Sequence, residues 1–532
     1  MTRRRTRTDL PPAPADPSAR DARSGRGAEL GRSMLRGAPR RGGRHGLAAL
    51  VPLALLLASC ATLRVEPPEP DVDPGVEVPP EWTAPGAGSL ADAAEAPDAW
   101  WRAFGDPALT SVVEEALATS FDLEAAAARL TQAEARARIA GADLWPSVDG
   151  SFSGSRTRRN FIGFPIPGGE ERVLSSTSTN LGVSLDVSWE ADLWGRVLAG
   201  RNAARARVDV ARADVAGAAL SLTGQTARVY FATVEAREQV ELARRSLESR
   251  ELTTERVRRR YEAGLARPLE LRLARADEAS ARSVLQARRR ALDALERQLE
   301  TLVGRYPGGA LETEAALGPP PPPVPPGVPS EIVTRRPDLS AAEARLAAAG
   351  FEVARARAAL YPRLALTGSA GRSSEELEDL LDSDFTVWSV AGNLLQPIFQ
   401  GGRLRAGVDL ARASFKEATA LYAGQLLQAL REVETALAAD AFLEGQVEAL
   451  GAAVEEAERA LELARERYRA GLQDFLTVLE AERRLYDAAS RRLEVRRARL
   501  DARIDLVLAL GGGFQASEPP PPPAPNPGDP NP

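Results

Sequence analysis

Apolar and polar residues alternate one by one in a stretch that begins near residue 181. Alternation with a period of two predicts a β-strand with one apolar and one polar face. Residues 147–156 are rich in Ser and Gly and are expected to form its partner strand, with a loop at Asn160–Gly169. The apolar positions are Leu181, Val183, Leu185, Val187 and Trp189, and the polar ones are Gly182, Ser184, Asp186 and Ser188.

The same plan recurs in the second half of the chain, with strands expected at Arg363–Gly371 and Thr386–Leu394 around a polar loop at Arg372–Asp384. Strands of about ten residues that are apolar outside and polar inside are typical of transmembrane barrels, although a soluble hairpin has the same pattern. Four strands cannot close a barrel, because the smallest bacterial barrels have about 8 and hydrocarbon does not tolerate open edges. A membrane location therefore requires several subunits, and the pattern does not choose between two and three.

Between and after these hairpins the chain is rich in Ala, Leu, Arg and Glu, which favours long helices. Matched glycines indicate two long helical hairpins, Gly195–Gly304 with a turn at Gly264 and Gly402–Gly511 with a turn at Gly471. The offset between the two copies is 207 positions. A continuous helix from the first glycine to the turn would be roughly 100 Å long.

A helical segment precedes each strand pair. It is expected at Asp106–Leu144, with an interruption near Ser120, and it recurs after Pro337. The chain is therefore predicted to be an internal duplication. The expected first repeat spans 100–304, with a β-hairpin at 147–189 and a helical hairpin at 195–304. The second spans 337–511, with a β-hairpin at 363–395 and a helical hairpin at 402–511. A tether at 60–99 precedes the first repeat, a Pro-rich connector at 305–336 joins the two, and a Pro-rich disordered tail at 512–532 follows.

Residues 1–59 indicate a targeting segment. Leu47–Ala58 is an apolar run that follows several arginines and is too short to span a membrane as a helix, so it is interpreted as a secretory signal. It ends in Leu-Ala-Ser before Cys60, which resembles a bacterial lipobox and implies acylation of Cys60. Because the basic leader is long, Met34 is predicted to be the true start.

Composition limits the chemistry. Cys60 is the only cysteine and His45 the only histidine, which removes His/Cys metal sites, Cys nucleophiles and Ser–His pairs from the rest of the chain. Residues 1–59 hold 12 of the 68 basic and 4 of the 74 acidic residues, so the remainder has a net charge of −14. That charge does not suit nucleic-acid binding. No enzyme activity, metal or cofactor is expected.

Taken together, the chain resembles the TolC-like outer-membrane efflux channels, in particular the lipidated branch that works with resistance-nodulation-division pumps. The resemblance covers about residues 60–512. The segments that carry it are Trp189–Arg196 (WEADLWGR), Gln396–Leu404 (QPIFQGGRL), 327–331 (GVPSE), 335–339 (RRPDL), Tyr468–Gly471 (YRAG) and 476–481 (LTVLEA).

The resemblance implies a mostly helical fold with some β-structure. It implies a homotrimer in which each chain lends four strands to a shared 12-stranded transmembrane β-barrel, continuous with a trimeric α-barrel tunnel across the periplasm. It also implies outer-membrane lipid, a periplasmic adaptor protein and an inner-membrane pump as partners. The expected function is passive export of small molecules. A type I protein secretion duct and a structural periplasmic coiled-coil lipoprotein are the alternatives, and the cargo is not readable from the sequence.

The resemblance also assigns roles to the two turns. The tips are expected to contact the adaptor, through Arg260, Gly264, Leu265, Gly471 and Leu472. The second turn is expected to gate the pore, through Asp474, Glu480, Tyr468, Arg467 and Gln473. Gln473 stands where the family usually has an aspartate, and Asp474 follows one residue later. Because one residue is about 100° around a helix, Asp474 could instead serve only as a first-turn acid.

Overall fold

The computed structural model describes residues 75–85, 99–161, 174–309, 311, 313–314, 316–322 and 329–512. The chain divides into two compact units, Met1–Ser59 and Cys60–Pro532, and every described residue belongs to the second unit. The predicted signal sequence with Met34 and His45, the lipidation residue Cys60 and nearly all of the predicted tail lie outside the described residues.

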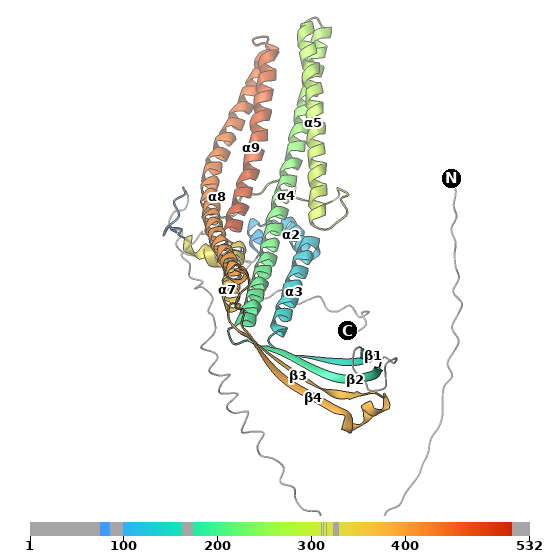
Figure 1. The fold of residues 1–532 in the computed structure, drawn as a ribbon. Helices are drawn as coiled ribbons and strands as arrows, with labels where there is room; N and C mark the ends of the chain where they lie inside the picture. The colour runs from blue at the N-terminus through green and yellow to red at the C-terminus, as the bar shows by residue number, and fades with distance from the viewer. Residues whose placement is uncertain are drawn as a thin grey trace, which may run out of the picture. The chain divides into compact units, whose positions relative to one another are not determined.

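Two long helical hairpins dominate this unit and run in the same direction (Figure 1). The first consists of α4 (Arg196–Glu262) and α5 (Pro268–Leu302), and the second of α8 (Arg403–Arg469) and α9 (Phe475–Ala509). In both hairpins the first helix has 67 residues and the second has 35. The equal lengths confirm that the fold is an internal duplication. Among the described residues, no helix is both long enough and apolar enough to cross a bilayer.

Each hairpin turns at a glycine in the left-handed region, with φ of 74° at Gly264 and 75° at Gly471. In the first turn the amide of Leu265 donates to the carbonyl of Arg260 at 2.8 Å, and the second turn has the equivalent bond at 2.9 Å. This six-residue closure satisfies carbonyls that the end of a helix leaves unpaired, and it favours glycine because the positive φ disfavours a Cβ.

Shorter helices pack beside the half of the hairpins that is nearer the strands (Figure 1). The serine at position 120 separates α2 from α3, and its hydroxyl accepts a hydrogen bond from the amide of Leu123 at 3.3 Å. This cap is the physical basis of the interruption expected there. The elements are η2 (Trp100–Phe104), α2 (Pro107–Thr119), α3 (Phe121–Ala142), η3 (Pro329–Glu331), α6 (Ile332–Arg335) and α7 (Pro337–Ala358).

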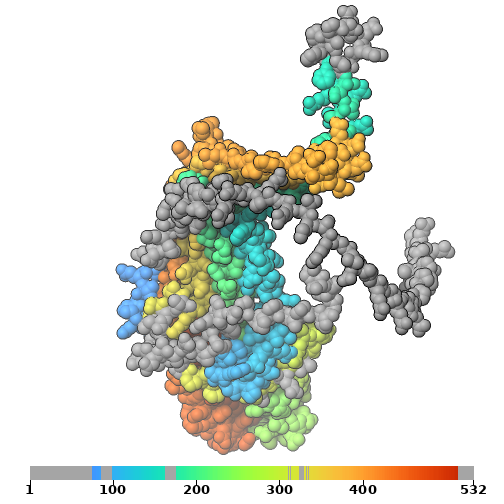
Figure 2. Space-filling model, turned by 90° about the horizontal axis from the view of Figure 1, so that it is seen from below, coloured from blue at the N-terminus to red at the C-terminus, as the bar shows by residue number. Residues whose placement is uncertain are grey.

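The four strands form one antiparallel sheet in the order β1-β2-β3-β4. In the view from the strand end, β3 and β4 extend beyond the helices (Figure 2). The strands are longer than expected at three places, because ladder pairing extends there. β1 continues into the predicted loop, β2 begins at Leu174 rather than near Leu181, and β3 continues past Gly371. Two short 3-10 turns, η4 (Glu378–Leu381) and η5 (Ser383–Phe385), occupy the loop before β4. The strands are β1 (Ser147–Phe161), β2 (Leu174–Ala191), β3 (Arg363–Ser374) and β4 (Thr386–Leu395).

In the register of the sheet, residues of similar polarity lie beside one another in rows that cross all four strands. One transverse row contains Val148, Val187, Gly368 and Val390. The next row contains Asp149, Asp186, Ser369 and Ser389. Because successive residues of a strand point to opposite faces, the sheet has one apolar face and one polar face.

Buried apolar side chains form three clusters along the hairpins rather than one central core. The first joins α2, α4, α5 and α9 and contains Trp100, Tyr230 and Leu299. The second joins α6, α7, α8 and α9, and side chains of the segment 75–85 pack on it. Glu434 of α8 fastens that segment, since its carboxylate accepts the amides of Thr83 and Ala84 at 2.8 and 2.7 Å. The third cluster lies at the two turns.

Candidate functional site

The two turns are joined by a polar contact between the hairpins. The hydroxyl of Tyr468, at the end of α8, donates a hydrogen bond to Glu270 of α5 at 2.9 Å. Burial and the neighbouring carboxylate raise the pKa of Tyr468 to about 12, so it remains a hydrogen-bond donor at physiological pH. The guanidinium of Arg260 lies 5.0 Å from the centre of the Tyr468 ring, a distance at which the cation is attracted to the ring face.

Apolar contacts surround this polar contact. The third cluster takes one or two residues from each of the four long helices, so that the tips of the two hairpins share a small core. Phe475 is almost completely buried in it, and its ring centre lies 5.4 Å from that of Tyr468. The buried members of the cluster are Val257, Leu271, Ala274, Leu461, Ala464, Phe475 and Val478.

A second polar contact lies further from the tip, within the second hairpin and against α4 of the first. Arg465 of α8 binds the carboxylate of Glu482 of α9 at 2.5 Å and also reaches the hydroxyl of Ser249 of α4 at 2.5 Å. Glu482 is buried, and one of its oxygens has no hydrogen-bond partner among the described residues. The ion pair lies within the second hairpin, and the hydroxyl of Ser249 links it to the first by also donating to Glu482 at 3.3 Å.

The residues predicted for the gate lie near the second turn but are not brought together. Asp474 caps the N-terminus of α9 by accepting the amide of Leu476 at 3.3 Å. Glu480 faces two arginines of its own helix, Arg483 and Arg484, and hydrogen bonds from them lower the pKa of Glu480. Gln473 donates to Thr477 at 2.9 Å, and the side chain of Arg467 makes no hydrogen bond or ion pair within the described part of the chain.

The residues predicted for the tips fall into three groups. Leu265 and Leu472 are 70% and 77% exposed at equivalent places in the two turns, which leaves apolar surface at the end of each hairpin. Gly264 and Gly471 form the turns themselves, and a Cβ at either position would meet no neighbour within 4 Å. Arg260 is different, because it is half-buried against Tyr468 and therefore belongs to the contact between the hairpins.

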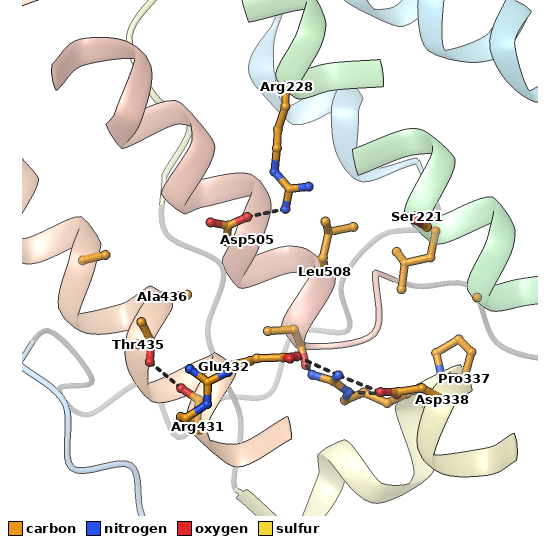
Figure 3. A pocket seen from close by; sticks show the side chains of 15 residues that line it. Ser221, Arg228, Pro337, Asp338, Arg431, Glu432, Thr435, Ala436, Asp505 and Leu508 are labelled. Atoms are coloured by element: carbon orange, nitrogen blue, oxygen red, sulfur yellow. Dashed lines mark hydrogen bonds and ion pairs between the residues drawn. The ribbon is translucent and has the colours of Figure 1, made fainter. Parts of the chain in front are cut away.

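A cavity of about 480 Å³ lies where α4, α7, α8 and α9 meet, at the middle of the unit (Figure 3). On one wall, Arg336 is buried between the carboxylates of Asp338 and Glu432, each at 2.8 Å. On another, Arg228 of α4 pairs with Asp505 of α9. The pair between Arg228 and Asp505 connects the two repeats, whereas the contacts of Arg336 join the connector to the second repeat.

Aromatic side chains gather where the helices meet the sheet. Trp194 stacks on Tyr361 with ring centres 4.8 Å apart, and its indole nitrogen donates to the carbonyl of Pro362 at 2.7 Å. Trp189 donates in the same way to the carbonyl of Leu144 at 3.0 Å, while Trp145 remains exposed. A band of Trp and Tyr at one end of an apolar sheet face is typical of the interface between membrane and water.

Sequence reasoning missed several of these residues. Glu270 and Arg260 come from the first hairpin and act on a tyrosine that follows about 200 residues later, so no local pattern connects them. The repeat offset could have provided one signal. Tyr261 occupies the position in the first turn that Tyr468 occupies in the second, yet it is 41% exposed. The described residues include no group of three His, Cys, Asp or Glu placed to hold a metal ion.

Comparison with known proteins identifies this arrangement. The family model described as "Outer membrane efflux protein" matches residues 112–305 and 328–512. The pyoverdine export outer membrane protein OpmQ of Pseudomonas putida is 37% identical over 483 residues, covering 88% of this chain and 98% of that protein. Outer membrane protein OprJ of Pseudomonas aeruginosa is 32% identical, covering 88% and 96% of the two chains.

The chain is also similar to solved structures of outer membrane channels. The CmeC outer membrane channel of Campylobacter jejuni superposes with a TM-score of 0.77 at 27% identity, covering 85% of this chain and 96% of that one. The MtrE outer membrane channel of Neisseria gonorrhoeae, in its open state, has a TM-score of 0.73 at 29% identity, with 85% and 99% coverage. The fold, the strand pattern and the relatives exclude a simple coiled-coil lipoprotein and favour efflux over protein secretion. The chain belongs to the outer membrane efflux protein family and forms an exit duct of the outer membrane.

Proposed function

We propose that three copies of this chain form one duct, in which 12 strands close a transmembrane barrel and the long helices form a tunnel through the periplasm. The observation that carries this proposal is the sheet itself. It has one apolar and one polar face, and the outer edges of its two edge strands, β1 and β4, are not paired with any other described strand. An open edge in hydrocarbon leaves backbone groups unsatisfied, so β1 of one copy must pair with β4 of the next.

Cysteine pairs across the two edges test this arrangement. One cysteine is placed in β1 between residues 149 and 155, and the second in β4 between 387 and 393. Oxidation of outer membranes should give covalent trimers for the pairs in register, and each single variant should give none. Pairs that join only within one chain, at every register, would contradict closure by neighbouring copies.

We propose that the contact at the turns holds the duct closed at its periplasmic end. Tyr468, Glu270 and Arg260 join the hairpins. Further from the tip, the hydroxyl of Ser249 in α4 links the first hairpin to the Arg465–Glu482 pair of the second. Asp474, Glu480, Gln473 and Arg467 border the same turn and would set its charge toward the channel. Opening requires the second hairpin to move away from the first, which costs these hydrogen bonds and exposes part of the shared apolar cluster.

The exposed leucines at positions 265 and 472, with the glycines that form the two turns, are proposed as the surface that meets a periplasmic adaptor protein. An inner-membrane pump of the resistance-nodulation-division type would supply the energy. The names of the relatives support small organic cargo, since OpmQ is named for pyoverdine export and TtgI of Pseudomonas putida for toluene efflux. Export of a labelled dye by cells with and without the gene, in the presence of the pump and adaptor, tests this role.

We also propose that Cys60, outside the described residues, is acylated and anchors the duct. The packing of segment 75–85 on α8 supports this, because it fixes the chain near the middle of the unit. From Thr83 back to Cys60 are 23 residues, which can span at most about 80 Å, while α8 from Glu434 back to Arg403 is about 47 Å long. The tether is thus long enough to reach the membrane. Radiolabelled palmitate should enter the wild-type protein and not Cys60→Ala.

A further inference from the structure

A groove of about 840 Å³ lies between α4, α7 and α8, close to the sheet. Apolar residues of α7 and α8 form part of its lining. The other part is strongly basic, since the lining contains a single carboxylate, that of Glu352. The arginines of the lining are Arg196, Arg207, Arg345, Arg355, Arg363 and Arg403.

Most of these arginines have carboxylate partners. Arg207 and Arg355 share Glu352, and Arg345 pairs with Asp214 at 2.9 Å. Two arginines differ from them. Within the described ranges, the guanidinium of Arg403 donates only to the amide oxygen of Gln400, and that of Arg363 makes no hydrogen bond or ion pair. Neither therefore has a carboxylate partner there. The groove therefore holds two guanidinium groups able to receive an anion.

The groove lies on the side of the polar sheet face. Arg363 is the first residue of β3, and alternation places it on the same face as Thr367 and Ser369. Arg196 makes a forked contact with Glu190 at 2.8 and 2.9 Å, and Glu190 shares the face of β2 that carries Asp186. Two separate side chains thus connect the groove with the polar face, which in the proposed duct faces the channel.

The spacing of residues along α4 also separates the side of the helix that faces the groove from the opposite side. Arg207 and Val210 follow Arg196 by 11 and 14 residues, so at 100° per residue all three lie on one side of the helix. Arg201 and Arg205 follow it by 5 and 9 residues and lie on the opposite side. There they line a different cavity together with the exposed Trp145, which belongs to the aromatic band.

We propose that this groove is a transit site for organic anions that carry carboxylate groups, at the point where the helical tunnel meets the barrel. Planar guanidinium groups bind carboxylates through two parallel hydrogen bonds, and the apolar part of the lining accepts the body of the molecule. A membrane lipid would approach from the apolar face, on the other side. This inference rests on the proposed duct, whose channel lies on the polar side, and it names the cargo class that the duct favours.

The test uses the full-length acylated protein and citrate as the probe. Citrate binding is measured by calorimetry on the detergent-solubilised protein, and citrate block is measured on single channels in planar bilayers with citrate added on the barrel side. The variant R363Q/R403Q should raise both the dissociation constant and the half-blocking concentration at least tenfold. The matched control R201Q/R205Q removes two arginines from the opposite side of the same region and should change neither value by more than twofold.

Unchanged binding in R363Q/R403Q, or an equal loss in R201Q/R205Q, would overturn the proposal. So would a phospholipid that native mass spectrometry finds on the wild type and not on R363Q/R403Q, since the groove would then hold lipid. Failure of the wild type to form channels would count against the duct, while calorimetry would still decide whether the groove binds the anion.

Discussion

Tyr468 of α8 and Glu270 of α5 are 198 residues apart in the sequence, and a hydrogen bond of 2.9 Å between them joins the tips of the two helical hairpins. The equivalent tyrosine of the first turn, Tyr261, is exposed and makes no such contact with the residues that the structure describes. The two repeats are therefore equal in length and unequal in chemistry at the turns. Closure of the duct is expected to depend on the second turn.

Tyr468→Phe should open the duct. It removes one hydrogen bond to a carboxylate per subunit, and bonds of this kind contribute about 1.5–3 kcal/mol. We expect a rise in the open fraction of at least tenfold, seen as increased single-channel conductance in planar bilayers. Glu270→Gln should also raise the open fraction. Tyr261→Phe is the matched control, since it deletes the same hydroxyl at the equivalent position, and an equal effect there would refute the assignment.

Asp474 and Glu480 are predicted to set the charge of the gate. Asp474→Ala and Glu480→Ala should each raise conductance or alter its dependence on cations. Asp474→Asn distinguishes the loss of charge from the loss of the helix cap. Asn keeps the cap of α9 and loses only the charge, whereas Ala also loses about 1 kcal/mol of capping energy. If conductance and selectivity stay at wild-type values in all three variants, these carboxylates do not belong to the gate.

The exposed leucines of the turns should be needed for assembly and not for the channel itself. Leu265→Ser combined with Leu472→Ser should abolish dye export in cells and weaken capture of the adaptor, because both changes remove apolar contact surface. Single-channel conductance should not change. Leu252→Ser, at an exposed leucine further along α4, provides the control. Normal export by the double variant would exclude the turns as the contact surface.

Asp501 of α9 should make stability depend on pH. Burial raises its pKa to about 6 from an ordinary value of 3.8, so the folded chain holds a proton that the unfolded chain has released between these values. The free energy of unfolding therefore falls as pH rises from about 4 to 6. Asp501→Asn should stabilise the protein by up to about 3 kcal/mol at pH 7.5 and have little effect at pH 4.

Thermal unfolding in detergent at the two pH values measures this effect. The exposed Asp505, which pairs with Arg228, provides a comparison, and Asp505→Asn should not show the same pH dependence. A shift for Asp501→Asn that is equal at both pH values would show that the carboxyl group of Asp501 titrates normally in the folded protein.

The sequence predicts the elements better than it predicts their contacts. Glycine spacing locates the turns at Gly264 and Gly471 because a positive φ is a local requirement that one residue type satisfies. Strand alternation is local in the same sense, so it indicates both faces of the sheet. The partners of Tyr468 and Glu434 depend on how distant segments pack, and no local pattern contains that information.

The ends of the strands show the same limit. Sequence places the end of the third strand at Gly371, but pairing with β2 continues to Ser374. The basic groove was also missed, because each of its arginines lies in a separate segment that is unremarkable alone. Only the arrangement of α4, α7 and α8 places them around one space.

The central claim is that neighbouring copies close the barrel whose four strands each chain provides. Native mass spectrometry of the full-length protein, extracted from the outer membrane in mild detergent, tests it most directly. The account predicts an assembly of three chains that dissociates only when boiled. A stable single chain or a dimer, with the same four strands protected from the solvent, would contradict it.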